Sequence, residues 1–465
     1  MRIADAGRSH RSEPLPRVAE RVRSVDVALL FEKAVREIDV ASALKYILAT
    51  RHGLTTEIIQ QNYPDQRLVR EISPKVVVLP FCYQERSNNF FFVRWRGATF
   101  FNLTWEQLFY PGNAAAKTPR GEFAVRHVIH NAWSDGYADI LRAQGVPEQH
   151  IFVSGNPAYA LYDEPYRRYF KSRAAFASDA GLDASRRWVF FPENYNWAFY
   201  EPPMLEQMVR DGQSVEQVQA MRESVTRSFE AAMQWCAVLA DREDVEVIVR
   251  PRPATPVDVF RRRVEEVLPR IPPRLSFIQR DTVREWVLAS DVVMSSYSTT
   301  LIEASIAGKP AYIVEPIPWP ASLRQEWHSL VRRVGSQDEF IAAATGAAAG
   351  DANALEGWAR STMLANGDPI VRIADHLAAI RRGTVTTPSP APWRSITLPG
   401  GHPLPERILF ELRRHIPGPS RAPARLAIDP ESLGDVAALA DLPDRVRRWQ
   451  PILDGYLDSL REATA

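Results

Sequence analysis

Hydrophobic residues gather in short runs along this chain, and longer stretches with helical spacing separate the runs. In the first third of the chain, apolar runs typical of buried strands occur at 25–31, 75–81, 98–105, 127–133 and 150–157. Residues 41–53 follow the first run with apolar side chains at helical spacing, and this stretch ends in a glycine. The alternation of strands and helices predicts a parallel sheet that is covered by helices on both faces.

The same alternation begins again after a polar, helical stretch at 161–185. Strand-like runs occur at 186–197, 245–253, 275–280, 291–298 and 311–316, and a long helical insertion reaches about residue 240 before the second of them. The sequence therefore predicts an α/β protein with two Rossmann-like domains that face each other across a cleft. The expected divisions are a disordered N-terminal segment at 1–24, domains at 25–185 and 186–383, a proline-rich linker at 384–405 and a helical appendage at 406–465.

Charge and cysteine content narrow the class of protein. The 57 Lys and Arg residues against 56 Asp and Glu leave no field that would attract nucleic acid, so no nucleic-acid partner is expected. Cys82 and Cys236 are the only cysteines, which excludes a disulfide framework and a cysteine-rich metal site. No signal peptide is recognisable, and no apolar run approaches the roughly 20 residues of a membrane span. A cytoplasmic protein is expected, and a peripheral position on the inner face of the membrane stays open.

The stretch "SSYSTTLIEASIAGKP", residues 295–310, places six consecutive hydroxyl-bearing side chains before a helical run. Thr300 and Glu303 have the spacing of a capping box, so simple helix capping is one interpretation. Capping uses one hydroxyl and does not explain the hydroxyls of Ser295, Ser296, Ser298 and Thr299. Ligands of doubly wound folds bind at the carboxyl ends of the strands, where the free N–H groups of a helix start attract phosphate. The stretch therefore predicts a phosphate site, with capping as the alternative.

A second loop of the same domain reads "RPRP" at 250–253. Arg250 and Arg252 are suited to bind phosphate or carboxylate oxygens with two parallel hydrogen bonds, and the prolines stiffen the turn. The alternative is a surface turn with two solvated arginines.

Four segments between residue 25 and residue 320 read "LLFEKAVREIDVASAL", "FFNLTWEQLF", "HNAWSDGYADILRAQGVPEQHIFVSGNP" and "VREWVLASDVVMSSYSTTLIEASIAGKPAYIVEP". In this order they resemble the bacterial surface carbohydrate biosynthesis proteins, a glycosyltransferase-B-type group. The chain is also similar, more distantly, to the capsule Kdo transferases, the sialyltransferases and the teichoic-acid polymerases. "TWEQ", "GNP" and "SSYSTTLIEA" are the most specific parts of the resemblance.

This resemblance implies transfer of a sugar from a nucleotide-activated donor during capsule or lipopolysaccharide assembly, without a metal or other cofactor. The donor would bind to the second domain, and a saccharide or lipid-linked saccharide acceptor would bind to the first. The implied donor-site residues are Ser295, Ser296, Ser298, Thr299 and Thr300 on phosphate, Glu303 on the loop or the ribose, and Glu315 toward the nucleotide. Arg252 stands where the relatives have histidine, and an arginine offsets the charge of a leaving phosphate but does not donate a proton at neutral pH.

Transfer to a hydroxyl needs a group near the acceptor that takes its proton. The loops after the first-domain strands offer Glu37, then Glu106 and Asp39, as candidates for this role. Asp39 is also suited to cap the helix that begins at "VASALKY", and Glu32 to pair with Arg36 on the surface. Whether transfer retains or inverts the sugar configuration is not indicated by the sequence.

Four further side chains in these loops are candidates for sugar contacts: Trp105, Glu193, Asn194 and Trp197. Aromatic rings pack well on the C–H face of a pyranose, although core packing is the alternative for each tryptophan. Glu193 alternatively caps the helical insertion that follows it. Residues 155–157, "GNP", are expected to form a tight turn between the domains.

A nucleotide-sugar glycosyltransferase is the favoured function, with a CMP-activated ulosonic acid as donor by analogy with the Kdo and sialic acid enzymes. The alternatives are a nucleotide-sugar 2-epimerase, which needs no acceptor, and a non-catalytic relative that binds nucleotide sugar. His127 and His130 fall on opposite faces of a predicted strand and so do not chelate one metal ion. The absence of a GxGxxG pattern argues against a dinucleotide cofactor.

The stretch "RVRRWQPILDGYL", residues 445–457, has one basic and one apolar face. Such a helix is suited to lie on an anionic membrane, which makes peripheral membrane contact one expectation. Packing against the protein's own body is the alternative.

Overall fold

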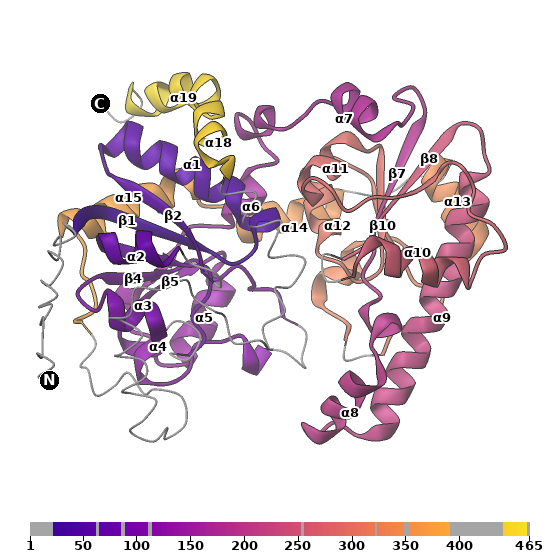
Figure 1. Cartoon of the computed structure of the whole chain (residues 1–465), viewed down its shortest axis with the longest axis horizontal. Coiled ribbons are helices and arrows are strands. Elements are labelled where there is room, and N and C mark those ends of the chain that lie inside the picture. Colours follow the sequence, from indigo (N-terminus) through magenta and orange to yellow (C-terminus); the bar gives the residue numbers. More distant parts are fainter. Residues whose placement is uncertain are drawn as a thin grey trace, which may run out of the picture.

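The computed structural model describes residues 22–61, 65–84, 89–109, 114–252, 255–320, 323–347, 353–390 and 440–462. Its elements form two halves that lie side by side, each built on one parallel sheet (Figure 1). The segment expected to be disordered, 1–24, falls almost wholly outside the described residues. So do most of the expected linker at 384–405 and the first part of the appendage at 406–465.

The first sheet has six parallel strands in the order β2-β1-β3-β4-β5-β6. Its strands are β1 (Arg23–Phe31), β2 (Thr56–Gln60), β3 (Ile72–Leu79), β4 (Thr99–Asn102), β5 (Val128–Ala132) and β6 (Ile151–Val153). Its helices are α1 (Ala34–His52), α2 (Gln66–Glu71), α3 (Asn89–Arg94), α4 (Glu122–Arg126) and α5 (Asp135–Ala143). The sequence did not predict β2, because "TEIIQ" holds only two adjacent apolar residues and forms a strand by pairing with β1.

The second sheet also has six parallel strands, in the order β12-β11-β10-β7-β8-β9. Its strands are β7 (Arg187–Pro192), β8 (Val245–Arg250), β9 (Leu275–Phe277), β10 (Val292–Ser295), β11 (Ala311–Val314) and β12 (Arg333–Val334). The helices of this region are α7 (Arg173–Ala180), α8 (Pro202–Arg210), α9 (Val215–Ala240), α10 (Val257–Glu265), α11 (Val283–Ala289), α12 (Thr300–Ile306), α13 (Gln337–Thr345) and α14 (Asn353–Met363), whereas α6 (Pro157–Ala160), which precedes them, packs on α1 of the first half. In Figure 1, α8 and the start of α9 extend away from the sheet.

Burial on both faces explains why the strands read as continuous apolar runs. On β1, Val27 and Leu29 belong to the core on one face, whereas Ala28 and Leu30 belong to the core on the other. Successive side chains of a strand point to opposite faces, so a strand between two helical layers needs apolar residues at every position. The α/β fold with two Rossmann-like domains is confirmed.

The chain passes from the second half back to the first through α14 and α15 (Pro369–Arg382). Ile370, Ile373 and Leu377 of α15 lie in the same core as α1 and β1, although they follow the second sheet in the chain. The "GNP" turn meets this return: Gly155 has φ 97°, and a Cβ there would lie 2.7 Å from the carbonyl oxygen of Met363. Only glycine fits this close approach of two backbones.

The end of the described chain forms α18 (Leu442–Arg448) and α19 (Gln450–Glu462), which lie over α1 (Figure 1). Trp449 is fully buried, stacks on Tyr169 with ring centroids 3.9 Å apart, and donates through Nε1 to Ser42 at 2.9 Å. Leu453 and Leu457 are buried in the same core. The apolar face of 445–457 therefore packs on the protein itself, which is one of the two interpretations that the sequence offered. In the described residues, no helix is long and apolar enough to cross a membrane.

Two contacts bring the carboxyl ends of both sheets together. Arg284 of α11 pairs with Asp39 of α1 at 2.8 Å, and both side chains are almost fully buried. The hydroxyl of Tyr162, after α6, donates to Glu303 of α12. The helix α1 follows β1 of the first sheet, whereas α11 and α12 follow β9 and β10 of the second. These contacts therefore hold the loops at the ends of the two sheets opposite each other.

Candidate functional site

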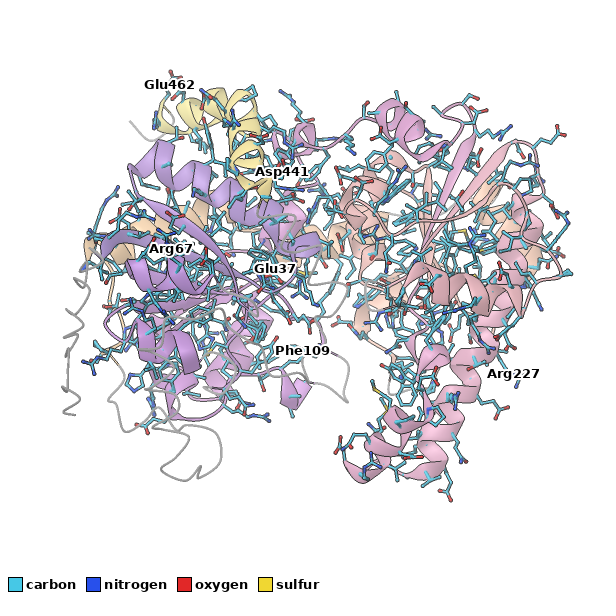
Figure 2. All side chains as sticks on the ribbon, viewed as in Figure 1. Glu37, Arg67, Phe109, Arg227, Asp441 and Glu462 are labelled. Atoms are coloured by element: carbon cyan, nitrogen blue, oxygen red, sulfur yellow. The ribbon has the colours of Figure 1, made fainter. Side chains whose placement is uncertain are left out.

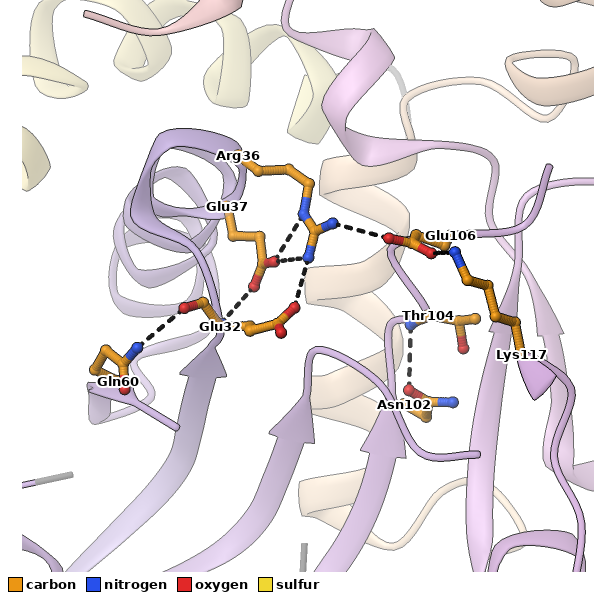
Figure 3. A network of polar contacts seen from close by, with 8 residues as sticks. All are labelled: Glu32, Arg36, Glu37, Gln60, Asn102, Thr104, Glu106 and Lys117. Carbon is orange, nitrogen blue, oxygen red and sulfur yellow. Dashed lines mark hydrogen bonds and ion pairs between the residues drawn. The ribbon is translucent and has the colours of Figure 1, made fainter. Parts of the chain in front are cut away.

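The first sheet ends in a network of charged side chains after β1 and β4 (Figure 3). Arg36, in the first turn of α1, lies 3.0 Å from Glu32, 2.5 Å from Glu37 and 3.4 Å from Glu106. Lys117 pairs with the other carboxylate oxygen of Glu106. Burial lowers the pKa of Arg36, but the three carboxylates around it raise the pKa on balance. Three carboxylates and two cations therefore share this edge of the sheet.

Glu37 and Glu106 differ in their access to solvent. The Glu37 side chain is 1% exposed and is held by Arg36 and by the backbone N–H of Glu32 at 2.8 Å. Burial raises the pKa of Glu37, and the charge of Arg36 opposes this rise. The Glu106 side chain is 40% exposed. Figure 2 shows Glu37 on the side of the first half that faces the second, so the network adjoins the meeting of the two halves.

Glu106 is the most exposed carboxylate of this network, and it is ionised at neutral pH. Burial raises its pKa, but the hydrogen bond and charge of Lys117, together with the charge of Arg36, lower the pKa on balance. Glu37, the first choice from the sequence for the acceptor-side base, is closed to solvent in this structure. Of these two carboxylates, Glu106 is therefore the one that is open to solvent.

The turn that carries Glu106 is strained and held on several sides. Thr104 has φ 53°, in the left-handed region that a β-branched residue rarely adopts. Asn102 accepts the Thr104 N–H at 3.2 Å, and Gln107 donates to the Thr104 carbonyl at 3.2 Å. Gln107 also accepts the N–H of Trp133 at 2.7 Å. These bonds maintain a conformation that the turn alone would not keep, and they fix the direction of Glu106.

His130 supports this turn from β5. Its Nε2 lies 2.7 Å from the Ala124 carbonyl, and its Nδ1 lies 3.0 Å from the side-chain nitrogen of Asn102. These partners assign the proton to Nε2, so that Nδ1 accepts from Asn102. Burial lowers the pKa of His130 to about 4, which keeps the imidazole neutral at neutral pH. His130 is thus a neutral support of the turn through Asn102.

The structure corrects two further first-domain expectations. Asp39 caps no helix, because α1 begins at Ala34; its side chain is 3% exposed and pairs with Arg284 and, at 3.4 Å, with Arg445. It joins the two halves and the appendage and is closed to an acceptor. Trp105 is buried in the core of the first half, so its ring is closed to a sugar.

The hydroxyl run spans the end of β10 and the start of α12. Ser295 donates to the carbonyl of Pro192 and thereby ties β10 to β7. Ser298 accepts the Thr300 N–H at 3.3 Å, and its hydroxyl lies 3.1 Å from that of Thr300. Thr299 is the N-cap of α12, and its side chain forms no cap hydrogen bond. The run therefore orders the loop through three of its hydroxyls.

The hydroxyl of Ser296 forms no hydrogen bond within the described part of the chain. The residue is fully buried, and its Oγ has no hydrogen-bond partner among the described residues. Buried hydroxyl groups almost always have a partner, so this position at the end of a parallel strand is a candidate for contact with a ligand. Thr299, three residues further on, is exposed to solvent.

Glu303 and Glu315 are both committed to protein contacts. Glu303 accepts from Tyr162 instead of closing the expected capping box with Thr300, and burial raises its pKa. Glu315 accepts from the Trp319 N–H and from Arg324, each at 2.8 Å. With 8% of its side chain exposed, Glu315 is not free to face a nucleotide, which corrects that expectation. Glu303 thus links α12 to the segment after α6.

The two arginines of "RPRP" have separate roles. Arg250 is buried, and its guanidinium donates to the carbonyls of Arg280 at 2.7 Å and Asp281 at 2.8 Å. Burial lowers its pKa to about 10. Arg250 therefore joins the loops after β8 and β9, and the expectation that it binds phosphate is corrected. Arg252 is half-buried, and no hydrogen bond or ion pair of its guanidinium occurs within the described residues.

The remaining second-domain candidates lie after β7. Glu193 is buried and accepts the N–H groups of Tyr195 and, at 3.4 Å, of Arg252. It caps no helix of the insertion. Asn194 is half-buried, and Trp197 packs against the core of the second half with its ring 5.5 Å from that of Tyr200. No group of three or more metal-ligating side chains occurs in the ranges that the structure describes.

The fold has known counterparts among solved structures. The structure of a variant of the wall teichoic acid polymerase TagF aligns with this chain at a TM-score of 0.51 and 9% sequence identity. The alignment covers 77% of this chain and 89% of the TagF chain. The *S. aureus* MnaA–UDP co-structure matches 79% of this chain and all of its own (TM-score 0.49, 12% identity). UDP-GlcNAc 2-epimerase of *Methanocaldococcus jannaschii*, in complex with UDP-GlcNAc and UDP, matches 76% and 99% (TM-score 0.47, 12% identity). No family model and no curated protein matches the chain.

These identities show the fold alone, and that fold is of the glycosyltransferase-B type, as the sequence predicted. The structure also adds residues that the sequence did not single out. Lys117, which lies in a stretch without a motif, holds Glu106, and Tyr162 holds Glu303. Their roles depend on contacts between segments far apart in the chain, and no local pattern marks them.

Proposed function

We propose that this protein is a metal-independent glycosyltransferase that transfers a sugar from a nucleotide-activated donor to a saccharide or lipid-linked saccharide acceptor of a bacterial surface polysaccharide, capsule or lipopolysaccharide. One observation carries the proposal. Two facing sheet edges differ in chemistry: an exposed, ionised carboxylate, Glu106, lies at the first, and Arg252, Ser296 and Thr299, whose side chains have no hydrogen-bond partner among the described residues, lie at the second. A transferase needs this division between an acceptor side and a phosphate side.

In the proposed reaction, an acceptor hydroxyl attacks the anomeric carbon of the donor sugar. The bond between that carbon and the donor phosphate oxygen breaks, and its electron pair stays on the phosphate. Glu106 takes the acceptor proton, while Arg252 and the hydroxyls of Ser296, Ser298 and Thr299 stabilise the leaving phosphate. Arg252 and the hydroxyl groups stabilise the negative charge of the leaving phosphate through hydrogen bonds and charge. Arg252 does not transfer a proton to the phosphate, because its guanidinium stays protonated at neutral pH.

The charge of the second edge supports a donor with a single phosphate. Other arginines near this edge are occupied: Arg250 by carbonyls, Arg280 by Asp281, Arg284 by Asp39, and Arg324 and Arg333 by Glu315. Arg252 is the remaining cation on the described strand-end loops of this sheet, and the carboxylate of Glu193 lies near it. A CMP-linked sugar, such as a CMP-ulosonic acid, fits this charge better than a diphosphate donor.

The test is turnover of CMP- and UDP-linked sugars with and without free and lipid-linked saccharide acceptors, followed by mass spectrometry. The proposal expects nucleotide release that depends on the acceptor, together with a product one sugar heavier. A 2-epimerase would instead change the donor sugar without an acceptor, and a binding protein would release no nucleotide. Either of these results would contradict the transferase assignment.

A further inference from the structure

The backbone of Arg252 is held from two sides by side chains of neighbouring strand-end loops. Glu193, after β7, accepts the Arg252 N–H at 3.4 Å. Gln279, after β9, donates to the Arg252 carbonyl at 2.6 Å. The same Gln279 nitrogen donates to the Thr255 carbonyl at 3.1 Å, so the two N–H groups of one amide hold both ends of this loop.

This arrangement fixes the backbone of Arg252 and leaves its guanidinium without a hydrogen-bond partner among the residues that the structure describes. Arg250, two residues earlier, shows the opposite arrangement, because its guanidinium is used to hold the backbone of the next loop. A side chain on a pinned backbone loses less conformational freedom when it binds a ligand. The pinned position of Arg252 therefore favours anion binding over a role in packing.

We propose that Gln279 and Glu193 are positioning residues that present the Arg252 guanidinium to the donor phosphate; this rests on the proposed function. Gln279 is uncharged, so its replacement leaves the local charge unchanged and acts on phosphate binding only through the position of Arg252. Glu193 also lies in electrostatic contact with Arg252, so its replacement changes both position and charge. Gln279 is therefore the cleaner residue to test.

The experiment is a double-mutant cycle on nucleotide binding with the full-length protein. CMP and UDP are titrated by calorimetry into the parent, Gln279→Leu, Arg252→Ala and the double variant. We expect Arg252→Ala to weaken binding of the better nucleotide about 10- to 100-fold, the range of a charge-assisted hydrogen bond. Gln279→Leu should weaken it about 5-fold in the parent but less than about 2-fold in the Arg252→Ala background, because positioning acts through Arg252.

A matched control removes a buried polar contact on the same sheet, away from the site. Glu246, near the start of β8, is buried and pairs with Arg186 at 2.8 Å. Glu246→Gln should lower the unfolding temperature while nucleotide affinity stays at the parent value. If Gln279 had a purely structural role, its replacement would also lower stability. The control shows whether a loss of stability alone weakens nucleotide binding.

Each outcome decides between the readings. Coupled losses at Gln279 and Arg252 support the inference. Equal losses from Gln279→Leu in both backgrounds overturn it and leave the proposed function intact, because the parent still binds. A folded parent that binds neither nucleotide overturns the proposed function and, with it, the role of Arg252 as a phosphate ligand.

Discussion

Asp39 and Arg284 form a buried ion pair, and replacing Asp39 should lower the free energy of unfolding more than replacing Arg284. The side chains are 3% and 4% exposed, and the charged atoms lie 2.8 Å apart. Removing one partner of such a pair costs about 3–5 kcal/mol, because the other charge stays buried without compensation. The cost at each end depends on which contacts remain for the residue that is left.

Asp39→Asn leaves the Arg284 cation buried beside the rings of Tyr162 and Phe170, at 5.6 and 5.4 Å from their centroids. Cation–π attraction recovers about 1 kcal/mol, so the expected loss is about 2–4 kcal/mol. Arg284→Met leaves Asp39 with its second partner, Arg445, at 3.4 Å. Methionine also fills much of the vacated volume, so the expected loss is about 1–2 kcal/mol.

The assay is urea unfolding of parent and variants, with small-angle X-ray scattering of the folded proteins. Because the pair joins the two halves, Asp39→Asn should also increase the radius of gyration. Asp458→Asn serves as the control, since Asp458 is exposed and pairs with Arg461 at 2.9 Å on one helix; its loss should stay below about 0.5 kcal/mol. Equal losses from Arg284→Met and Asp39→Asn, or losses no larger than that of the control, would show that the pair does not stabilise the protein in this way.

Three other predictions concern the turn, the pH response and the appendage. Glu106→Gln should lower turnover at least about 100-fold with donor affinity unchanged, whereas Glu37→Gln should mainly lower the unfolding temperature; equal turnover losses would contradict this. For His130, with a folded pKa of about 4, stability should fall as the pH drops below 6.5, where the unfolded chain takes up the proton first. The slope, up to about 1.4 kcal/mol per pH unit, should flatten in His130→Gln, as urea unfolding from pH 7 to 5 would show. Trp449→Ala should weaken docking of the appendage by about 3–5 kcal/mol, measured as faster hydrogen exchange confined to 442–462; unchanged exchange would contradict the packing.

Periodicity alone predicted the two parallel sheets, because strands buried on both faces read as uninterrupted apolar runs. A tight turn at "GNP" was expected from the sequence, whereas the close approach of its backbone to Met363, which Gly155 permits, was not predicted. The strand β2 and the return of α15 to the first half were not predictable. Both depend on pairing and packing with segments distant in the chain, which a local pattern does not encode.

The candidate site was predictable as a set of loops but not as a set of free side chains. Glu37 and Glu106 look alike in sequence, and only the fold shows that one is sealed by Arg36 and the other is open. Arg250 and Arg252 are separated by one proline, yet only Arg252 keeps a free guanidinium within the described residues. A sequence motif identifies which residues reach a strand end, whereas tertiary contacts decide which of them can bind a ligand.

We propose above that the hydroxyl loop of the second half, residues 295–300, binds the donor phosphate. Calorimetric titration of CMP into the parent and into the Ser298→Ala, Thr299→Ala double variant tests it most directly. We expect saturable binding to the parent and a loss of at least about 10-fold in the variant, with only a small drop in unfolding temperature from the lost contact between Ser298 and the Thr300 N–H. Equal affinity in the two proteins, or no binding to a folded parent, would contradict it and return the loop to the role of a helix start.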